Sequence, residues 1–277
     1  MQRVAWFSAG ISSFIASYLA KPDRIVFINV ANQHPDTLRF IADAERILNQ
    51  PIEIIGSYDY RQSVDEVILR DRYLNGPGGA RCTLMLKKRV RQEWERRNCA
   101  DGLTYIWGYD STERKRAERT AQNSEFPCEF PLIERNLRKE DCHALADQLG
   151  IKRPEMYELG YANNNCIGCV KGGKGYWNRI RVDFPDVFER RAKEERVLGR
   201  SCINGTFLDE LDPNAGNMRT EVMPACSFDC VGVLEDDEWR LRLAAYSAAI
   251  RISTSAMPKR ASRCGLTKRL TANVLSQ

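Results

Sequence analysis

The sequence predicts an α/β protein with a doubly wound, mainly parallel sheet of about five strands. Four short apolar runs, at residues 3–7, 24–31, 51–57 and 103–110, are rich in β-branched and aromatic residues and lack regular polar alternation. Such runs are typical of strands buried on both faces. Stretches with apolar residues at helical spacing separate them, and strands that alternate with helices favour a parallel sheet with helices on both sides.

The expected helices cover residues 14–20, 37–50, 63–74, 83–97, 112–122 and 138–149. The segments that follow are rich in glycine and cysteine and have little sheet character. We therefore predict a main domain at 1–235, which includes a cysteine-rich segment, and a basic C-terminal extension at 236–277 that is helical or disordered. Because ligands of parallel sheets bind beyond the carboxyl ends of the strands, the loops that carry Ser8, His34, Cys82 and Gly108 are expected to face one crevice.

Composition excludes several classes of protein. No window approaches the roughly 18 consecutive apolar residues of a membrane span, and the N-terminus lacks a secretory signal, so we expect a cytoplasmic protein without membrane contact. The net charge of +5 arises in the tail, because six Lys or Arg and no acidic residue lie from Arg251 to the end. That tail could contact nucleic acid electrostatically, or it could be a solvated end.

The loop after the first strand has the features of a phosphate site. It contains Ser8, Ala9, Gly10, Ile11, Ser12 and Ser13 and leads directly into a helix. The unpaired amides and the positive end of the dipole at a helix N-terminus attract anions, although serines at this place can also cap the helix. The P-loop pattern of ordinary ATPases and kinases is absent from this sequence.

Cysteine spacing indicates a metal or redox site. Of the ten cysteines, Cys166 and Cys169 form a Cys-x-x-Cys pair, Cys226 and Cys230 form a second pair, and Cys82 follows a glycine-rich turn. Three alternatives remain open: structural zinc on the two pairs, an iron–sulfur cluster that uses Cys82, Cys166, Cys169 and one more cysteine, and a dithiol redox pair. The other cysteines have no ligand-like spacing; Cys142 is expected in the core and His143 in packing.

Basic residues near the expected crevice suggest a second anion contact. Arg116 and Arg119 are three residues apart on a predicted helix, where two guanidiniums can hold a phosphate or sulfate, although interleaved acids also fit a solvated face. Lys87 lies in the basic segment after Cys82. His34 precedes a proline in a crevice loop, which favours either a ligand contact or a turn.

The residues at 8–13 resemble the pyrophosphatase loop, SGG-x-D-S, of the PAPS reductase and N-type ATP-pyrophosphatase superfamily, whose adenine nucleotide alpha-hydrolase-like members have a HUP-like fold. Ser8, Gly10 and Ser13 match, whereas Ala9 replaces a glycine and Ser12 replaces an aspartate. Three further segments also resemble those of this superfamily. They are the turn at 32–37, Gly108 with Arg114, Arg116 and Arg119, and the Phe-Pro-Leu-Ile sequence at 130–133. The missing aspartate puts the usual loop geometry and magnesium placement in question.

Several short sequence segments are similar to a phage- or mobile-element-associated branch of this superfamily. They lie around Cys82, around Cys166 and Cys169, and at residues 176–178 and 207–211. The resemblance covers about residues 3–230 and implies a 4Fe-4S cluster held by cysteines in these places. APS reductases have two adjacent cysteines near the position of Cys82, where this chain has one. Cys226 lies in a segment that departs from the Glu-Cys-Gly-type tail of PAPS reductases.

The resemblance implies an adenine-nucleotide-dependent enzyme of sulfur chemistry, in which ATP is used for adenylation and sulfur transfer follows at the cysteine centre. A reductase that releases sulfite from PAPS or APS is the first alternative. A nucleotide-binding partner subunit with structural zinc is the second, because the loop lacks aspartate. The expected ligands and partners are ATP or PAPS, magnesium, a sulfur donor protein and a second copy of the chain.

Overall fold

The computed structural model describes residues 1–221 except 76–78 and 101. Its centre is a sheet of five strands: β1 (Gln2–Phe7), β2 (Arg24–Ile28), β3 (Ile52–Ile55), β4 (Leu103–Ile106) and β5 (Cys128–Glu129). The strand order is β3-β2-β1-β4-β5, and every pair of neighbours is parallel. The chain winds outward from β1 in one direction and then from β4 in the other. The predicted fold class is therefore confirmed, with the switch in strand order between β1 and β4.

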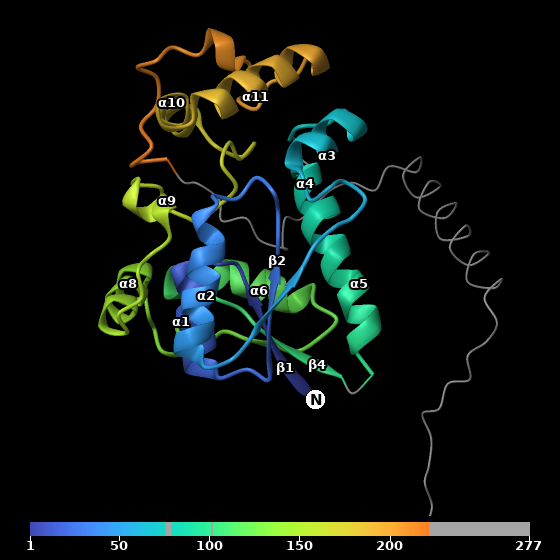
Figure 1. Cartoon of the computed structure of the whole chain (residues 1–277), viewed down its shortest axis with the longest axis vertical. Helices are drawn as coiled ribbons and strands as arrows, with labels where there is room; N and C mark the ends of the chain where they lie inside the picture. The colour runs from blue at the N-terminus through green and yellow to red at the C-terminus, as the bar shows by residue number, and fades with distance from the viewer. Residues whose placement is uncertain (76–78, 101, 222–277) are drawn as a thin grey trace, which may run out of the picture. The chain divides into compact units, whose positions relative to one another are not determined.

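Helices cover both faces of the sheet (Figure 1). On one face, Ala5 and Phe7 of β1 share a core with α1 (Ile11–Ala20), α2 (Asp36–Leu48) and α8 (Lys139–Gln148). On the other face, Val4 and Trp6 pack with α5 (Arg89–Asn98) and α6 (Arg114–Gln122). Successive residues of a strand point to opposite faces, so a strand covered on both sides has to be apolar throughout. This explains the continuous apolar runs of the sequence.

The basic segment forms one long helical stretch with an irregular middle. It consists of α4 (Arg81–Thr83), a π-helical turn η1 (Leu84–Lys88) and α5, and it follows α3 (Val64–Asp71). A π-helical turn within an α-helix contains an extra residue and is frequent at functional sites.

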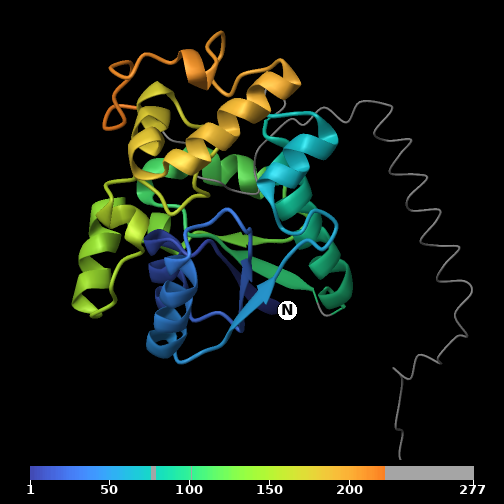
Figure 2. The same ribbon diagram turned by 45° about the horizontal axis from the view of Figure 1, so that its top comes forward.

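A third hydrophobic core lies outside the two layers of the sheet. It is centred on Trp177, which is fully buried, and contains residues of α9 (Glu155–Glu158), α10 (Lys174–Asp183), α11 (Pro185–Leu198) and the 3-10 helix η3 (Leu208–Glu210). In Figures 1 and 2, α10 and α11 lie beyond the ends of the strands that are opposite the N-terminus. The cysteine-rich segment therefore covers the carboxyl edge of the sheet. The remaining short helices are η2 (Ser111–Glu113) and α7 (Pro131–Glu134).

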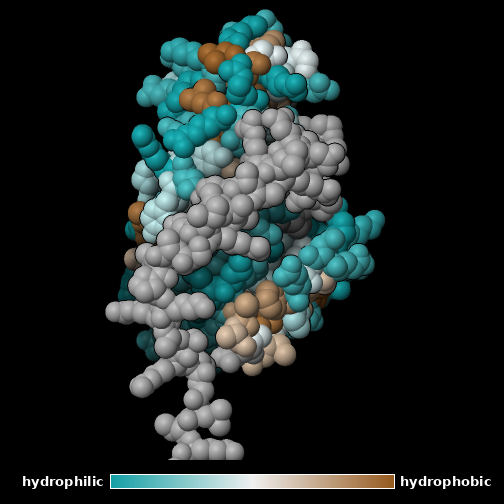
Figure 3. Space-filling view, turned by 90° about the vertical axis from the view of Figure 1, so that its right-hand side faces the viewer, coloured by the Kyte–Doolittle hydropathy of each residue, from teal (hydrophilic) through white to brown (hydrophobic). Residues whose placement is uncertain are grey.

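Large exposed apolar side chains, including Leu69, Val182 and Val197, come from different helices. The coloured part of the face in Figure 3 is mainly hydrophilic, with hydrophobic patches separated by polar side chains. None of the helices in the described part of the chain has the length and apolar character needed to cross a membrane. Three of the predicted features lie outside the described residues. They are the domain boundary at 235/236, the basic extension at 236–277, and the second cysteine pair, Cys226 and Cys230.

Candidate functional site

The loop between β1 and α1 is a tight turn with one residue in an unusual backbone conformation. Ala9 has a φ of 56°, in the left-handed region, and is completely buried. Gly10 is extended (φ −106°, ψ 161°) and precedes the first turn of α1 without a side-chain cap. Left-handed backbone is costly for a residue with a Cβ. The loop thus has the backbone that glycine would adopt, although alanine occupies the position.

The three serines of the loop have different roles. The Ser13 hydroxyl donates to the Gly10 carbonyl (2.8 Å) and accepts hydrogen bonds from the Ser8 amide (3.2 Å) and hydroxyl (3.0 Å). Its hydrogen-bonding capacity is therefore used within the loop. The Ser12 hydroxyl bonds to the thiol of buried Cys142, whose pKa is raised by burial to about 12. Ser8 is exposed, so its hydroxyl can turn toward a ligand.

Gly108 brings the loop after β4 against the phosphate loop. A Cβ at this position would lie 2.5 Å from the Cα atom of Ser13 and 2.7 Å from its nitrogen. Only glycine allows the two backbones to approach this closely. The structure therefore brings Gly108 and residues 8–13 together at the switch in strand order.

Two residues that the sequence analysis did not select also contact the phosphate loop. The Ile11 amide donates to the Tyr157 hydroxyl (3.4 Å), and the Asn164 side-chain amide donates to the Ala9 carbonyl (2.8 Å). Asn164 is 7% exposed, and its Oδ1 atom has no hydrogen-bond partner within residues 1–221 as described. Sequence spacing does not identify either residue as part of a site, because Tyr157 is on a helix of only four residues and Asn164 is one of three consecutive asparagines.

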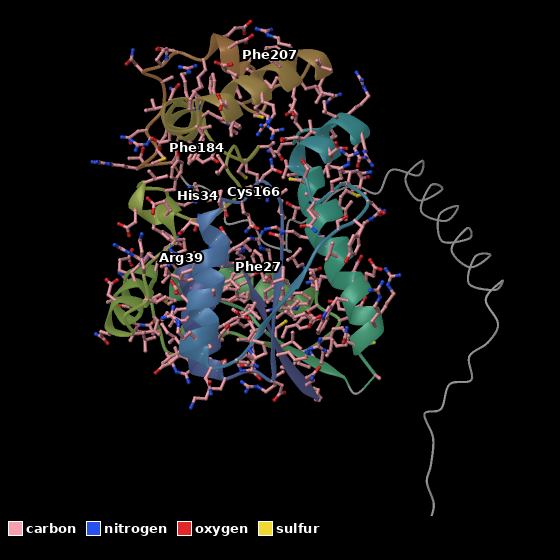
Figure 4. All side chains as sticks on the ribbon, viewed as in Figure 1. Phe27, His34, Arg39, Cys166, Phe184 and Phe207 are labelled. Carbon is pink, nitrogen blue, oxygen red and sulfur yellow. The ribbon has the colours of Figure 1, made fainter. Side chains whose placement is uncertain are left out.

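His34 lies at the start of α2, where its Nδ1 atom accepts a hydrogen bond from the Asp36 amide (3.2 Å). Its ring packs edge-on against Phe184, with 6.1 Å between the ring centroids. Figure 4 shows His34 near Phe184 and Cys166, at the carboxyl edge of the sheet. These contacts are those of a turn and packing residue, and a ligand contact stays a prediction.

The next residues of α2 fix the segment that carries Tyr157. Arg39 binds the Asp36 carboxylate with two nitrogens (2.8 and 2.7 Å) and donates to the carbonyls of Lys152 and Arg153. Asp36 also accepts a hydrogen bond from the Glu155 amide (2.9 Å). The pKa of Asp36 is lowered, chiefly by its hydrogen bond to Arg39. This charged bridge holds α9 beside the phosphate loop.

The Cys166-x-x-Cys169 turn is anchored at several points. The Ile167 amide donates to the Asn32 carbonyl (2.8 Å) in the loop after β2. The Tyr176 hydroxyl accepts from the Cys169 amide (2.9 Å) and donates to the Cys166 carbonyl (3.3 Å). Gly168 has a φ of 70°, and a Cβ there would lie 2.6 Å from Val187. Both cysteines are 8% exposed, and their turn lies at the carboxyl edge.

Cys82 is connected to this region through Arg191, which is 1% exposed. The Arg191 guanidinium binds Asp65 of α3 (2.8 Å) and Glu194 (2.6 Å) and interacts electrostatically with Cys82 and Cys202. Burial raises the pKa of Cys202 well above its usual range. The Cys202 thiol is therefore protonated at neutral pH in the metal-free protein.

No three His, Cys, Asp or Glu side chains within the described ranges (1–75, 79–100 and 102–221) form a group that could hold a metal ion. Cys82, Cys166 and Cys169 therefore do not make such a group by themselves. Cys142 is fully buried, as the sequence predicts, and the His143 ring packs against Tyr157 at 4.9 Å between centroids. The assignment of Cys82, Cys166, Cys169, Cys226 and Cys230 as ligands stays a prediction.

The basic residues expected to bind an anion differ in their surroundings. Arg116 forms an ion pair with Glu113 and lies 4.3 Å from the centroid of the Tyr109 ring, whereas Arg119 is exposed. Glu113 and Asp110 form a capping box that begins the η2–α6 segment just after Gly108. Lys87 is half-buried in the π-helical turn. An anion clamp by Lys87, Arg116 and Arg119 stays a prediction.

No protein-family model matches the chain, and no curated protein matches it by sequence. Among solved structures, it is similar to the phosphoadenylyl-sulfate (PAPS) reductase of Candida auris in a phosphate complex. The TM-score is 0.40 at 14% identity, over 57% of this chain and 78% of that chain. It is also similar to the NMN synthetase of Francisella tularensis, with a TM-score of 0.37 at 14% identity, over 76% and 82% of the two chains. Because these scores are low, the fold class rests on the strand pairings above.

Proposed function

We propose that this chain is an adenine-nucleotide-dependent enzyme of sulfur chemistry, with one site at the carboxyl edge of its sheet. The observation that carries the proposal is the link between the phosphate loop and the cysteine turn. Asn164 binds the Ala9 carbonyl at 2.8 Å, and Cys166 follows two residues later in the chain. Ile167 binds Asn32 in the adjoining loop. An anion-binding helix N-terminus and a pair of thiols therefore belong to one structural unit.

In this proposal the nucleotide phosphates bind residues 8–13, where α1 contributes the amides of its first turn and its dipole. Ser8 is the exposed serine of the loop, and its hydroxyl can exchange its hydrogen bond to Ser13 for one to a phosphate oxygen. Gly108 and His34 border the site. Lys87, Arg116 and Arg119 neutralise the distal anion.

With ATP, an oxygen of the acceptor attacks the α-phosphorus and pyrophosphate leaves, so that the acceptor is adenylated. A sulfur nucleophile from a donor protein then attacks the activated carbon and AMP leaves with that oxygen. The phosphate loop stabilises the leaving pyrophosphate by hydrogen bonds from its amides. The thiols of Cys166 and Cys169 lie on the segment that holds this loop, which supports their participation in the sulfur step.

The residues described here do not complete the metal site that the resemblance implies. A structural zinc site or a 4Fe-4S cluster normally takes four ligands, and Cys166 and Cys169 supply two thiols on one buried turn. Two more thiols would have to complete the set: Cys226 and Cys230 for zinc, or Cys82 and one further cysteine for the cluster, where Cys226 and Cys230 lie outside the described residues. We assign no chemical step to a metal, and the 4Fe-4S cluster remains the preferred proposal over zinc.

Anaerobic purification followed by optical and EPR spectroscopy, metal analysis and an assay of pyrophosphate release tests the proposal. We expect a coloured protein that releases pyrophosphate from ATP in the presence of an acceptor. Cys166→Ser should remove the colour, whereas Cys99→Ser, at an exposed cysteine, should leave it unchanged. A colourless protein with one zinc per chain would contradict the cluster, and release of sulfite from PAPS or APS would favour a reductase.

A second candidate function is a nucleotide-binding partner subunit. The observation that favours it is Ser12, which stands where the resembled loop has aspartate and bonds to Cys142. The loop therefore has no carboxylate with which to hold magnesium. Nucleotide binding without turnover, under conditions that include a sulfur donor, would support this function over the first.

A further inference from the structure

Tyr157 occupies a fixed place beside the phosphate loop. Its helix is held by Asp36, which accepts from the Glu155 amide, and by Arg39, which binds the two carbonyls just before α9. The Tyr157 ring packs edge-on against His143 at 4.9 Å. The hydroxyl end therefore points at the loop because the rest of the side chain is constrained.

The hydrogen bonds of this hydroxyl leave its proton for another acceptor. The oxygen accepts hydrogen bonds from the backbone amides of Ile11 and Asn164. A phenol has one donor and a limited acceptor capacity, and two amides use the latter. Among the residues the structure describes, no acceptor is found for its proton. Burial raises the pKa of Tyr157 to about 12, so the hydroxyl keeps this proton at neutral pH.

The space above Gly10 is bounded by two hydroxyls from different parts of the chain. A Cβ built on Gly10 would lie 3.2 Å from the Tyr157 oxygen and 3.4 Å from the Ser8 hydroxyl oxygen. The first amide of α1, that of Ile11, borders the same space, because it donates to the Tyr157 oxygen (3.4 Å). A hydroxyl donor, a second hydroxyl that can rotate, and helix N-terminal amides are the groups that a phosphate oxygen requires.

We propose that Tyr157 binds the ligand directly, by donating its hydroxyl proton to an anionic phosphate oxygen seated over Gly10. This inference rests on the proposed nucleotide function and adds a specificity-determining residue to it. Tyr157 thereby distinguishes a phosphorylated ligand from a nucleoside, since only the former places an anionic oxygen at this point.

The test is a calorimetric titration of the 277-residue chain with inorganic pyrophosphate and with ATP. Tyr157→Phe keeps the ring and removes the donor, so both affinities should fall about tenfold, as for loss of a hydrogen bond to a charged group. The matched control is Tyr18→Phe, at a tyrosine of α1 that is 40% exposed. Its affinities should stay within about twofold of the original, as expected for a surface change.

A second variant keeps the test valid if Tyr157→Phe does not fold. Gly10→Ala keeps the Tyr157 hydroxyl, and the extended backbone of Gly10 accommodates alanine. Its methyl group would occupy the proposed seat, at 3.2 Å from the Tyr157 oxygen. We expect a loss of pyrophosphate and ATP affinity of at least about tenfold, with little change in the melting temperature.

The outcomes separate this inference from the proposed function. If the unchanged chain binds neither pyrophosphate nor ATP, both are wrong. If it binds them and the Tyr157→Phe or the Gly10→Ala variant binds them equally well, the proposed function survives and the role of Tyr157 is refuted. A Tyr157→Phe protein that melts much earlier and retains full affinity would show that the tyrosine is only structural.

Discussion

The phosphate loop and the cysteine turn lie at the same edge of the sheet, but they are held in place differently. The phosphate loop is fixed mainly by neighbouring backbone, because β1 pairs with β2 and β4 and Gly108 lies against Ser13, and the side chains of Tyr157 and Asn164 add hydrogen bonds to it. The cysteine turn is held by the Tyr176 side chain between Cys166 and Cys169, and α11, whose Val187 lies against Gly168, is joined to α3 by the Arg191 side chain. We infer that crowding at Gly108 disturbs the first region most, and that loss of the buried Arg191 side chain disturbs the second region most.

The largest effect is expected at Arg191, because its guanidinium is buried between two carboxylates. Arg191→Met would leave Asp65 and Glu194 without their buried partner and should lower the free energy of unfolding by about 3 to 5 kcal/mol. Arg190→Met is the control, because Arg190 is 48% exposed and binds the same Asp65 at 3.2 Å. It should cost less than about 1 kcal/mol. Urea unfolding of both variants measures the difference, and equal losses would contradict the role of Arg191.

The next effect tests backbone crowding at Gly108. A methyl group at this position would meet the Ser13 backbone at 2.5 Å, and Gly108→Ala should therefore cost about 2 to 3 kcal/mol. In the cysteine region, Gly173→Ala would meet only the Glu221 carboxylate at 2.7 Å, a side chain that can move. It should cost less than about 1 kcal/mol. Thermal unfolding of the two variants tests this, and a greater loss at Gly173 would reverse the comparison.

A smaller, pH-dependent effect is expected at Asp36, which joins α2 to the Tyr157 segment. The hydrogen bond from Arg39 lowers its folded pKa below the ordinary value of 3.8. The associated stabilisation is therefore fully present above pH 3.8 and is lost as the pH falls through the lower folded value. Asp36→Asn should cost about 1 to 2 kcal/mol at pH 7.

Unfolding of Asp36→Asn and of the original chain, followed from pH 7 down to the acid range, checks this sign. The difference between them should shrink as the acid is protonated. Asp43→Asn is the control, because Asp43 also binds Arg39 (2.7 Å) but makes no contact with Glu155. A pH-independent loss in Asp36→Asn would show that the contribution comes from packing and not from charge.

The smallest effect is a gain in stability. Ala9→Gly removes the Cβ from a left-handed residue and should stabilise the chain by about 0.5 kcal/mol, because relief of strain slightly exceeds the entropy lost by glycine. Ala16→Gly, in the middle of α1, is the control and should destabilise by about 1 kcal/mol. Denaturant midpoints measured side by side decide the question. A loss in Ala9→Gly would mean that buried contacts of this methyl outweigh the strain.

The sheet could be predicted because each strand packs against an apolar layer on both of its faces and is therefore apolar throughout. The runs at 24–31, 51–57 and 103–110 contain β2, β3 and β4, which are shorter than the runs because the last residues enter the crevice loops, and the run at 3–7 covers all of β1 except Gln2. β5 has two residues and carries no periodic signal. The helices α10 and α11 were not predicted, because their buried set includes the charged residues Arg191, Glu194 and Glu195 together with Trp177.

The candidate site could be predicted only where local sequence determines position. Residues 8–13 and Gly108 follow strands directly, so their place follows from the topology. Tyr157 and Asn164 reach the loop from about 150 residues away, through contacts that depend on the tertiary fold. For Ser12 and Ser13, the position in the loop could be predicted, but the directions of their hydroxyls could not, because these depend on contacts with Cys142 and Gly10.

The Asn164 bridge to Ala9 has a thermodynamic consequence. The bridge ties the loop that would bind nucleotide to the segment that contains Cys166. Where two binding events share such an element, each changes the affinity of the other by the same factor. Oxidation or metallation of the cysteine pair that shifts Asn164 would alter nucleotide affinity, and bound nucleotide would alter the free energy of that modification equally. Under the proposed function, the state of the sulfur and the occupancy of the phosphate loop would therefore report on one another.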